Sequence, residues 1–431
     1  MNIKNEIIKK MVKKHGSPLY VYSGIELYNT YMNFKALVND QIDIFLSLKA
    51  NNNVSIAKLF RIWGSGIEVA SLGELNLALK AGFSKKDIIF SGPGKNRIAL
   101  EAAIDNRIYC IIVESLEELN TIGDIARKKH IKVNIGIRIN PNTDLTKTGI
   151  KMGGVPRQFG IDESQIPLAI ETLKKNKLLN FLGIHIYSGT QIFDENQILA
   201  SFKYTIEIAK ELFFKHNLLC EMIDLGGGFG VPYFSRQQPI NIKYIIENLN
   251  ITIEALDSVF KNTRFIIESG RYLLAKSGLY VTSALYSKIS KGEKFVVTDG
   301  GMNHHASSTF RGRFIRDNFP VYIIKKQPER DFRKEKVNIV GPLCTPEDCL
   351  FKNIELPTIE VDDLICIENS GAYGLSFSPM NFLGHETPAE ILITSKQEYL
   401  IRNRGNISDL LLNQNIINPG DDPVVRKSSR L

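Results

Sequence analysis

Eight short apolar runs alternate with amphipathic segments between about Gln41 and Gly270, and this alternation constrains the fold more than any other feature. The runs are β-branched or aromatic, as buried parallel strands are: Ile42–Leu48, Ile67–Ala70, Asp87–Phe90, Tyr109–Val113, Val133–Ile139, Phe181–Ile186, Met222–Leu225 and Phe265–Ile267. Segments with helical spacing separate them, such as Val54–Trp63, Glu74–Ala81 and Leu116–Lys129. The pattern predicts an α/β fold, a (β/α)₈ TIM-type barrel with its chemistry at the carboxyl ends of the strands.

The pattern changes after about Lys276. Strand-like runs then follow one another without helices: Gly278–Tyr286, Phe295–Thr298, Val337–Val340, Leu364–Ile367 and Ala389–Ile393. Gly, Pro and Asn separate them, which predicts a C-terminal β-barrel or sandwich domain. The early run Pro18–Tyr22 is a candidate for the same sheet. We therefore expect a barrel over residues 25–275, a β-domain from 1–24 plus 276–403, and a polar tail over 404–431.

Composition narrows the class of protein. The chain has 431 residues and a formal charge of +8, but it has no dense basic stripe interleaved with aromatic residues, so a nucleic-acid partner is not expected. The cysteines are odd in number and form no CxxC pair, which indicates neither a disulfide framework nor a zinc site. No apolar run reaches membrane-spanning length and the start lacks an apolar signal region. We expect a cytoplasmic enzyme without a membrane contact or a metal.

Lys49 ends the first apolar run, in the sequence FLSLKANNN. A lysine at the mouth of a barrel is partly desolvated, which is expected to lower its pKa and free the amine for Schiff-base chemistry. A solvent-facing lysine at a strand end is the alternative, and on its own Lys49 favours that alternative. Its interpretation therefore depends on the other motifs.

Two further motifs follow predicted strands. The loop Gly226–Gly230 comes after Met222–Leu225, where exposed backbone N–H groups and an expected helix start would favour a phosphate. Glu268-Ser269-Gly270-Arg271 comes after the last strand, where a carboxylate can hold a pyridinium nitrogen protonated and an arginine can bind phosphate. A surface Glu/Arg ion pair is the alternative for the second motif.

Together these motifs resemble the fold-type III pyridoxal 5′-phosphate (PLP) decarboxylases, which include the diaminopimelate, ornithine and arginine enzymes and share the alanine racemase-like architecture. The resemblance spans roughly Ser17 to Ile401. Its blocks occur in the order of the family: LKANNN, EVASLGE, GIHIYSGTQ, LGGGFG, ESGR, DGGMN, GPLCTPEDCL and SGAYG. It implies amino-acid decarboxylation with PLP as cofactor.

Carried onto this chain, the resemblance implies that Lys49 forms the Schiff base and Glu268 pairs with the pyridine nitrogen. Residues implied around the phosphate and the rest of the cofactor are Gly227, Gly228, Gly270, Arg271, Tyr373, Thr190 (in a position usually given to serine) and Glu68. Cys344 and Asp348 would reach across a homodimer interface into the partner's site, where they and Tyr373 would contact substrate. Cys344 or Lys49 would return a proton to Cα; the alternative for Cys344 is a small buried hydrophobe.

The chain departs from the family in two blocks. Tyr187 stands where a histidine usually stacks on the cofactor ring, while His185 is either a neighbour of the cofactor or a satisfied interior histidine. Thr345 follows Cys344 where diaminopimelate decarboxylases carry a glutamate that recognises the distal end of the substrate. GVPRQFG, GPLCTPEDCL and GAYGLSFSPMNFLGHETPAEIL resemble instead a branch whose substrates are tethered to carrier proteins.

This branch implies decarboxylation of a glutamyl group on an acyl carrier protein, giving a 4-aminobutyryl thioester in antibiotic biosynthesis. Carrier proteins are acidic, so Arg311, Arg313 and Arg316 could steer one, or could lie on an ordinary solvated loop. The other hypothesis is decarboxylation of a free amino acid such as meso-diaminopimelate. An alanine racemase is disfavoured because no Tyr-Gly-His follows Lys49. A non-catalytic relative is disfavoured because the site motifs are present. His304 and His305 fit either a site lining or a surface loop.

Overall fold

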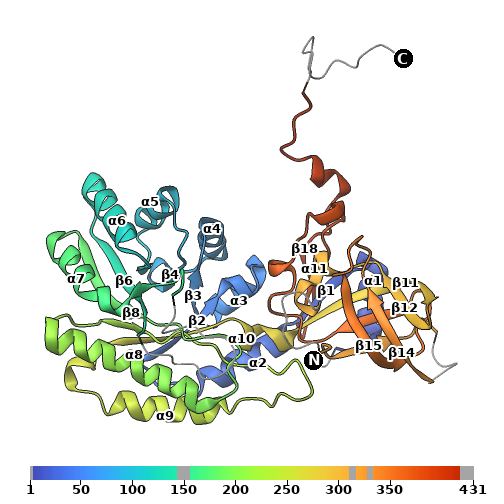
Figure 1. Cartoon of the computed structure of the whole chain (residues 1–431), viewed down its shortest axis with the longest axis horizontal. Coiled ribbons are helices and arrows are strands. Elements are labelled where there is room, and N and C mark those ends of the chain that lie inside the picture. Colours follow the sequence, from blue (N-terminus) through green and yellow to red (C-terminus); the bar gives the residue numbers. More distant parts are fainter. Residues whose placement is uncertain (1–2, 143–155, 310–316, 328–332, 418–431) are drawn as a thin grey trace.

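The computed structural model describes residues 3–142, 156–309, 317–327 and 333–417. Figure 1 shows an elongated molecule, with a helix-ringed barrel at one end and a sheet-rich body at the other. Among the described residues, no helix combines the length and apolarity that crossing a membrane would require.

The barrel consists of eight parallel strands in the described part of the chain. They are β2 (Ile42–Ser47), β3 (Gly66–Val69), β4 (Ile88–Phe90), β5 (Cys110–Val113), β6 (Val133–Asn140), β8 (Leu179–His185), β9 (Met222–Asp224) and β10 (Arg264–Ser269). The pairing runs β5-β4-β3-β2-β10-β9-β8-β6, and β5 pairs with β6 to close the ring. Each strand overlaps one predicted run, so the (β/α)₈ prediction is confirmed. A short strand β7 (Ile161–Asp162) adds to the end of β6.

Helices cover the outside of the barrel (Figure 1). They are α2 (Gly24–Lys35), α3 (Val54–Ile62), α4 (Leu72–Ala81), α5 (Arg97–Asn106), α6 (Leu116–Lys129), α7 (Ile166–Lys175), α8 (Glu195–His216), α9 (Ile242–Glu254) and α10 (Arg271–Leu274). Most begin at a polar N-cap whose side chain accepts a backbone N–H, as Ser71 does for α4 and Ser115 for α6. These caps fix where the helices start, and the loops between the strand ends and the caps are left free to form a site.

The barrel interior is layered. Its lower part is an apolar cluster that includes Phe45, Ile112, Met222 and Ile266. Since side chains alternate along a strand, the residue two positions beyond Met222 faces the interior as well, and so does the residue two beyond Ile266. Those residues are Asp224 and Glu268, both buried. A layer of acids therefore follows the apolar layer along the barrel axis, nearer the carboxyl ends of the strands.

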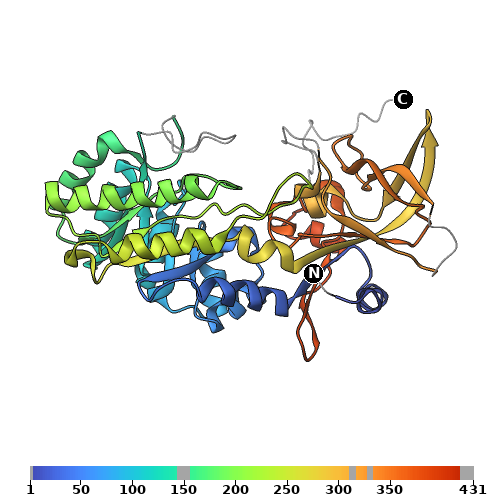
Figure 2. The same cartoon turned by 90° about the horizontal axis from the view of Figure 1, so that it is seen from below.

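The second body is a sheet of nine strands within the described residues. They are β1 (Leu19–Ser23), β11 (Gly278–Ser290), β12 (Glu293–Thr298), β13 (Val321–Ile324), β14 (Lys334–Val340), β15 (Cys349–Pro357), β16 (Leu364–Ile367), β17 (Ala389–Ile393) and β18 (Glu398–Arg402). β1 pairs antiparallel with β11 and parallel with β17, which confirms that the early run Pro18–Tyr22 joins this sheet. Helix α1 (Asn5–His15) packs Ile8 and Met11 onto it (Figure 2).

Three of these strands escaped the sequence analysis for identifiable reasons. Charged residues interrupt the apolar run of β15, whereas β13 (VYII) and the centre of β18 (YLI) are short apolar runs of three or four residues that were not singled out. The described part of the predicted polar tail, 404–417, is less polar than expected, because Ile407, Leu411 and Leu412 are exposed there. The predicted domain bounds remain a prediction.

Backbone and side-chain hydrogen bonds join the barrel mouth to the second sheet. Asn51 Nδ2 donates to Gly371 O at 3.1 Å, and Tyr373 N donates to Ala50 O at 2.7 Å. Asn53 Nδ2 also donates to Glu390 Oε2 at 2.8 Å. The residues just after Lys49 therefore hold the loop around Tyr373 against the open end of the barrel.

Candidate active site

A cavity opens at the carboxyl ends of the barrel strands, and the loop around Tyr373 closes one side of it. Its lining comes from β2, β10 and the loops that follow β8 and β9: Ser47, Lys49, Tyr187, Thr190, Gly228, Phe229, Glu268, Ser269, Gly270, Arg271, Tyr272 and Tyr373. Eight of the predicted site residues are among them, although they are spread over more than 300 positions of the sequence.

Lys49 lies in a single 3₁₀ turn, Leu48–Ala50, immediately after β2. Its side chain is 41% exposed because it faces the cavity, yet protein surrounds that cavity. Burial lowers the pKa of Lys49, but the carboxylates of Glu68 and Glu268 raise it more, so the pKa lies above its usual value. The expectation of a lowered pKa was wrong, because the sequence did not reveal two acids next to the amine.

Glu68 is the acid nearest to Lys49. It lies on β3, is 1% exposed, and has its carboxylate 3.4 Å from Lys49 Nζ. Ser91 Oγ, on the loop after β4, donates a hydrogen bond to the same carboxylate. Burial raises the pKa of Glu68, but Lys49 and the hydroxyl of Ser91 outweigh burial and leave it lowered, so Glu68 is ionised.

Tyr187 forms one wall of the cavity, with its ring centroid 5.7 Å from Lys49 Nζ. Behind it, the guanidinium of Arg138 lies 6.0 Å from the ring centroid of Tyr187 and 4.9 Å from that of Phe159. Glu114 Oε1 accepts a hydrogen bond from Arg138 Nη1 at 2.9 Å and Glu114 is 5% exposed. Arg138 and Glu114 were not predicted as site residues, although a charged residue inside the apolar run Val133–Ile139 was a usable signal.

The glycine loop adopts backbone conformations that favour glycine at two positions, with φ of 65° at Gly226 and 98° at Gly228. Gly227 lies so close to β10 that an added Cβ would be 1.9 Å from Glu268 O. No helix begins directly after the loop, because α9 starts only at Ile242. The expected helix start is therefore wrong, and any anion there would depend on loop N–H groups and on side chains. Gly228 and Thr190 line the cavity, whereas Gly227 packs against β10.

Arg271 lines the cavity as a second cation besides Lys49. Its Nη1 lies 3.3 Å from Tyr233 Oη, and its guanidinium is 4.4 Å from the ring centroid of Tyr373. Arg271 Nε is buried and has no hydrogen-bond partner among the described residues. A buried donor on a cation without a partner suits an anionic group in the cavity. Tyr233 was missed by the sequence analysis.

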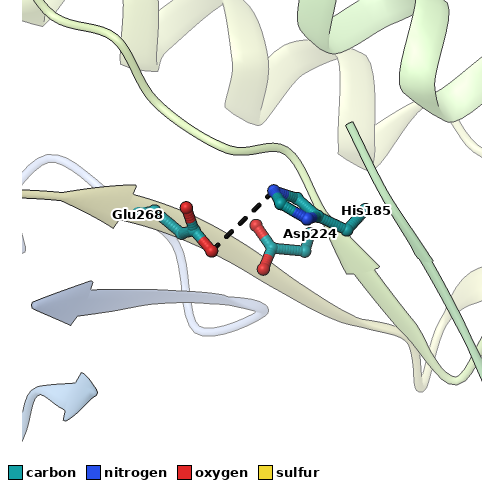
Figure 3. Close-up of side chains that lie close together, drawn as sticks. All are labelled: His185, Asp224 and Glu268. Carbon is teal, nitrogen blue, oxygen red and sulfur yellow. Dashed lines mark ion pairs between the residues drawn. The ribbon is translucent and has the colours of Figure 1, made fainter. Parts of the chain in front are cut away.

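Three ionisable side chains from neighbouring barrel strands lie close together, as Figure 3 shows: His185 at the end of β8, Asp224 at the end of β9 and Glu268 on β10. His185 Nε2 is 3.8 Å from Glu268 Oε1. Burial lowers the pKa of His185, helped by the charges of Arg138 and Lys49, so the ring is neutral. Asp224 was not singled out in the sequence, where it stands as an acid at the end of an apolar run.

Such a trio could hold a metal ion, because one donor atom from each residue lies within 4.8 Å of the others. The positive charges of Lys49 and Arg138 act on the same carboxyl groups and disfavour a cation there. A group that carries both a cationic ring nitrogen and an anion suits the electrostatics better, since both a carboxyl group, that of Glu268, and a guanidinium, that of Arg271, line the cavity.

The remaining predicted residues lie elsewhere. Cys344 is exposed, and neither it nor Asp348 lines the cavity. Asp348 is 3% exposed and accepts backbone N–H bonds from Met302 and Leu343. Arg311, Arg313 and Arg316 lie outside the described residues.

His304 and His305 are neither site lining nor surface residues. Both are interior histidines, with His304 Nε2 2.8 Å from Glu386 O and His305 Nε2 2.8 Å from Ser370 Oγ. Burial lowers the pKa of His304 to about 4, so this ring is neutral at physiological pH.

The cavity fits pyridoxal phosphate on several independent observations. It offers an amine at its floor, a buried acid at one end, an aromatic wall, and a cation with an unpartnered donor beside a glycine loop. Three buried polar atoms on residues that line the cavity have no hydrogen-bond partner among the described residues: Glu268 Oε1, Ser269 Oγ and Arg271 Nε. Buried polar groups are rarely left unsatisfied, so this set indicates a polar ligand.

Comparison with known proteins gives a consistent result. Residues 26–275 match the family "Pyridoxal-dependent decarboxylase, pyridoxal binding domain". The chain is 49% identical over 416 residues, covering 96% of it and 97% of the relative, to an "L-glutamyl-[BtrI acyl-carrier protein] decarboxylase" of Niallia circulans. It is 31% identical over 404 residues to the diaminopimelate decarboxylase of Helicobacter pylori, covering 93% and 96% of the two chains.

Solved structures agree on the whole fold. The diaminopimelate decarboxylase of Helicobacter pylori, complexed with L-lysine, superposes with a TM-score of 0.83 at 31% identity over 94% of this chain and 98% of the other. A diaminopimelate decarboxylase from Methanocaldococcus jannaschii gives a TM-score of 0.86 at 27% identity, covering 95% and 94%. The similarity therefore includes both the barrel and the second sheet.

Proposed function

Because this chain belongs to the family of pyridoxal-dependent decarboxylases, we propose that it decarboxylates a glutamyl group carried as a thioester on an acyl carrier protein. The products would be CO₂ and a 4-aminobutyryl thioester. The observation that carries the proposal is the 49% identity over nearly the full length of both chains to the glutamyl-carrier enzyme, against 31% to diaminopimelate decarboxylases.

The cofactor would be pyridoxal 5′-phosphate, attached through the amine of Lys49. Glu268 would face the ring nitrogen, and Tyr187 would pack on a ring face, with its wall position supporting this role. Phosphate ligands would be Arg271, Gly228, Thr190 and Tyr373. Gly227 and Gly270 would shape the backbone around them. Glu68 would bind near the amine end of the cofactor.

When bound, pyridoxal phosphate supplies an electron sink for the pair of electrons left at Cα as CO₂ departs. The protein supplies position and protons. Glu68 holds Lys49 Nζ at the cavity floor through their ion pair, and neutral His185 fills the space beneath Glu268. Lys49 would return a proton to Cα from its ammonium form, which its raised pKa keeps available.

Cys344 is the other candidate proton donor. It is exposed on the loop between β14 and β15 and does not line the cavity of its own chain, so it would act only in the site of a second copy. Asp348 would accompany it by holding the loop that carries Cys344, through its bond from Leu343 N. The proposed assembly is therefore a homodimer with shared active sites.

Two features of charge in this chain support a substrate tethered to a carrier protein. A thioester removes the distal carboxylate of glutamate, so the site needs no charged partner at that end, and Thr345 is uncharged. The net charge of +8 favours encounter with an acidic carrier protein, and Arg311 belongs to the segment proposed to steer it.

The test measures CO₂ release by the full-length holoenzyme from glutamyl-carrier thioester, beside free glutamate, meso-diaminopimelate, ornithine, arginine and lysine. We expect release from the thioester alone. Glutamyl-pantetheine without the protein should react more slowly, because it lacks the docking surface of the carrier. Turnover of free diaminopimelate in preference to the thioester would contradict the proposal.

Lys49→Arg is the matched control. Arginine keeps the positive charge that pairs with Glu68, so the fold is preserved, but it cannot form a Schiff base. CO₂ release should disappear together with the visible absorbance of the bound cofactor. Full turnover by this variant would refute the role of Lys49.

A further inference from the structure

The side chains of Asp224 and Glu268 lie close together (Figure 3), and both are buried. Asp224 is 0% exposed and Glu268 is 3% exposed. Asp224 pairs in register with Ile266, so Glu268, two residues beyond, faces the same barrel interior one step nearer the mouth. The fold thus places the two acids together where both side chains are almost fully buried.

The pair lacks enough hydrogen-bond donors for two ionised carboxylates. Asp224 Oδ1 accepts the N–H of Gly226 at 2.9 Å, but Asp224 Oδ2 and Glu268 Oε1 have no donor among the described residues. One carboxyl oxygen of each side chain lies within 4.8 Å of the other, and a hydrogen bond with Glu268 lowers the pKa of Asp224. Two carboxylates cannot make that bond, because neither is a donor; a carboxylic acid and a carboxylate can.

The surroundings favour a proton in the pair. Burial raises the pKa of Asp224 to about 7, and burial followed by repulsion from Asp224 and Glu68 holds the pKa of Glu268 well above its usual range. The groups that face the pair from the neighbouring strands and loops are Glu68, Lys49, Arg138 and neutral His185. Lys49 and Arg138 reduce the effect of burial without cancelling it.

We propose that Asp224 and Glu268 act as a carboxyl pair that keeps one proton on Glu268 for delivery to the ring nitrogen of the bound cofactor, with Asp224 as its positioning residue. The O–H bond of Glu268 breaks and an N–H bond forms, leaving a carboxylate beside a pyridinium, so the transfer needs no proton from solvent. The proposal rests on the proposed function only in taking pyridoxal phosphate as the cofactor.

The first test counts protons as pyridoxal 5′-phosphate is titrated into the cofactor-free full chain, by calorimetry in buffers of different ionisation enthalpy. At about pH 8, above the pKa of Asp224, cofactor binding to wild type should take up few protons from solvent, because Glu268 supplies the proton of the ring nitrogen. In Asp224→Asn the amide donates to Glu268, which favours its ionised form. This variant should take up about one additional proton per cofactor bound. Equal uptake by both proteins would overturn the proposal.

Asp105→Asn is the matched control. It makes the same substitution on the exposed face of α5, where Asp105 pairs with Lys129, and it should leave the proton count at the wild-type value. A shift in this control equal to that of Asp224→Asn would also count against the pair, because the effect would then not be local.

A second measurement covers the case in which Asp224→Asn binds no cofactor. Infrared spectra of cofactor-free wild type at about pH 8 should contain the carbonyl band of a buried carboxylic acid, because the pKa of Glu268 is raised. Glu268→Gln should remove that band. Its absence from wild type would refute the stored proton. Neither experiment uses an amino-acid substrate. The carboxyl-pair proposal can therefore be contradicted while CO₂ release supports the proposed function, and the proposed function can be contradicted while the proton measurements support the pair.

Discussion

The Nζ atom of Lys49 lies 3.4 Å from both carboxylate oxygens of Glu68, at the floor of the cavity. This ion pair has two effects that act on the same amine. It orients the side chain toward the cavity, and it holds the pKa of Lys49 above its usual value despite burial. The amine is therefore stored as an ammonium ion until a reaction takes its proton.

Glu68→Gln should lower the pKa of Lys49, because it removes the carboxylate that contributes most to the raised value. The deprotonated amine would then be present at lower pH. The rate at which the Schiff-base absorbance appears, after pyridoxal 5′-phosphate is added to cofactor-free protein, should rise at a lower pH than in wild type. An unchanged pH dependence would show that the ion pair does not govern the amine.

Arg271→Ala should weaken cofactor binding by about 10- to 150-fold, which corresponds to the roughly 1.5–3 kcal/mol of a hydrogen bond to a charged group. Arg271→Lys should recover part of the loss, because it keeps the charge but not the forked geometry. Tyr233→Phe removes the hydroxyl 3.3 Å from Arg271 Nη1 and should have a smaller effect in the same direction. Equilibrium dialysis of pyridoxal 5′-phosphate measures all three, and equal affinity for Arg271→Ala and wild type would remove Arg271 from the phosphate site.

Tyr187→Ala should weaken cofactor binding roughly 2- to 10-fold, since an aromatic ring contact contributes about 0.5–1.5 kcal/mol. Tyr187→Phe keeps the ring and should bind as wild type does. Tyr187→His should add a group that titrates near neutral pH to the profile of kcat/KM. A Phe variant that loses as much affinity as the Ala variant would assign the effect to the hydroxyl instead of the ring.

Glu114→Gln should destabilise the protein by about 3–5 kcal/mol, because it leaves the buried guanidinium of Arg138 without its counter-charge. Chemical denaturation of the cofactor-free chain measures this change. The double variant Glu114→Gln/Arg138→Met should recover much of the loss, since no unpaired charge remains. Additive losses in the double variant would mean that the two residues stabilise the fold independently.

Asp224→Asn should change the pH dependence of stability in cofactor-free protein. The folded state keeps the Asp224 proton up to about pH 7, whereas the usual pKa is 3.8. Between these values the folded state binds more protons than the unfolded state, so wild-type stability falls as pH rises. Asparagine does not titrate, so the variant should not lose this part of its stability. From about pH 5 to pH 8, the free energy of unfolding of the variant relative to wild type should therefore rise by roughly 2–4 kcal/mol, measured from melting curves. A constant difference over that range would contradict the raised pKa.

The strand pattern was enough to predict the barrel, because buried parallel strands require continuous apolar runs and a closed barrel requires eight of them. The same rule placed Lys49, Glu268 and the glycine loop at the mouth, since each follows such a run. It failed for β15, where Lys352 and Glu355 interrupt the run, because one face of an antiparallel strand can remain in water.

Residues whose neighbours are distant in sequence were harder to predict. Asp224 and Arg138 are single charged residues in apolar runs, and their partners Glu268 and Glu114 come from other strands. His304 and His305 also depend on remote groups, Glu386 and Ser370, for the bonds that satisfy them in the interior. No local pattern encodes such pairs.

The sequence by itself determined the order of strands and helices and which residue types stand at each strand end, because these depend on the periodicity of neighbouring residues. The tertiary structure alone decided the charge states, because it places Lys49 beside Glu68 and Glu268 and places Asp224 beside Glu268. It also decided that Cys344 does not line the cavity of its own chain. The reason is that a pKa depends on burial and on charges a few ångströms away in space, and closing the barrel is what brings those groups together.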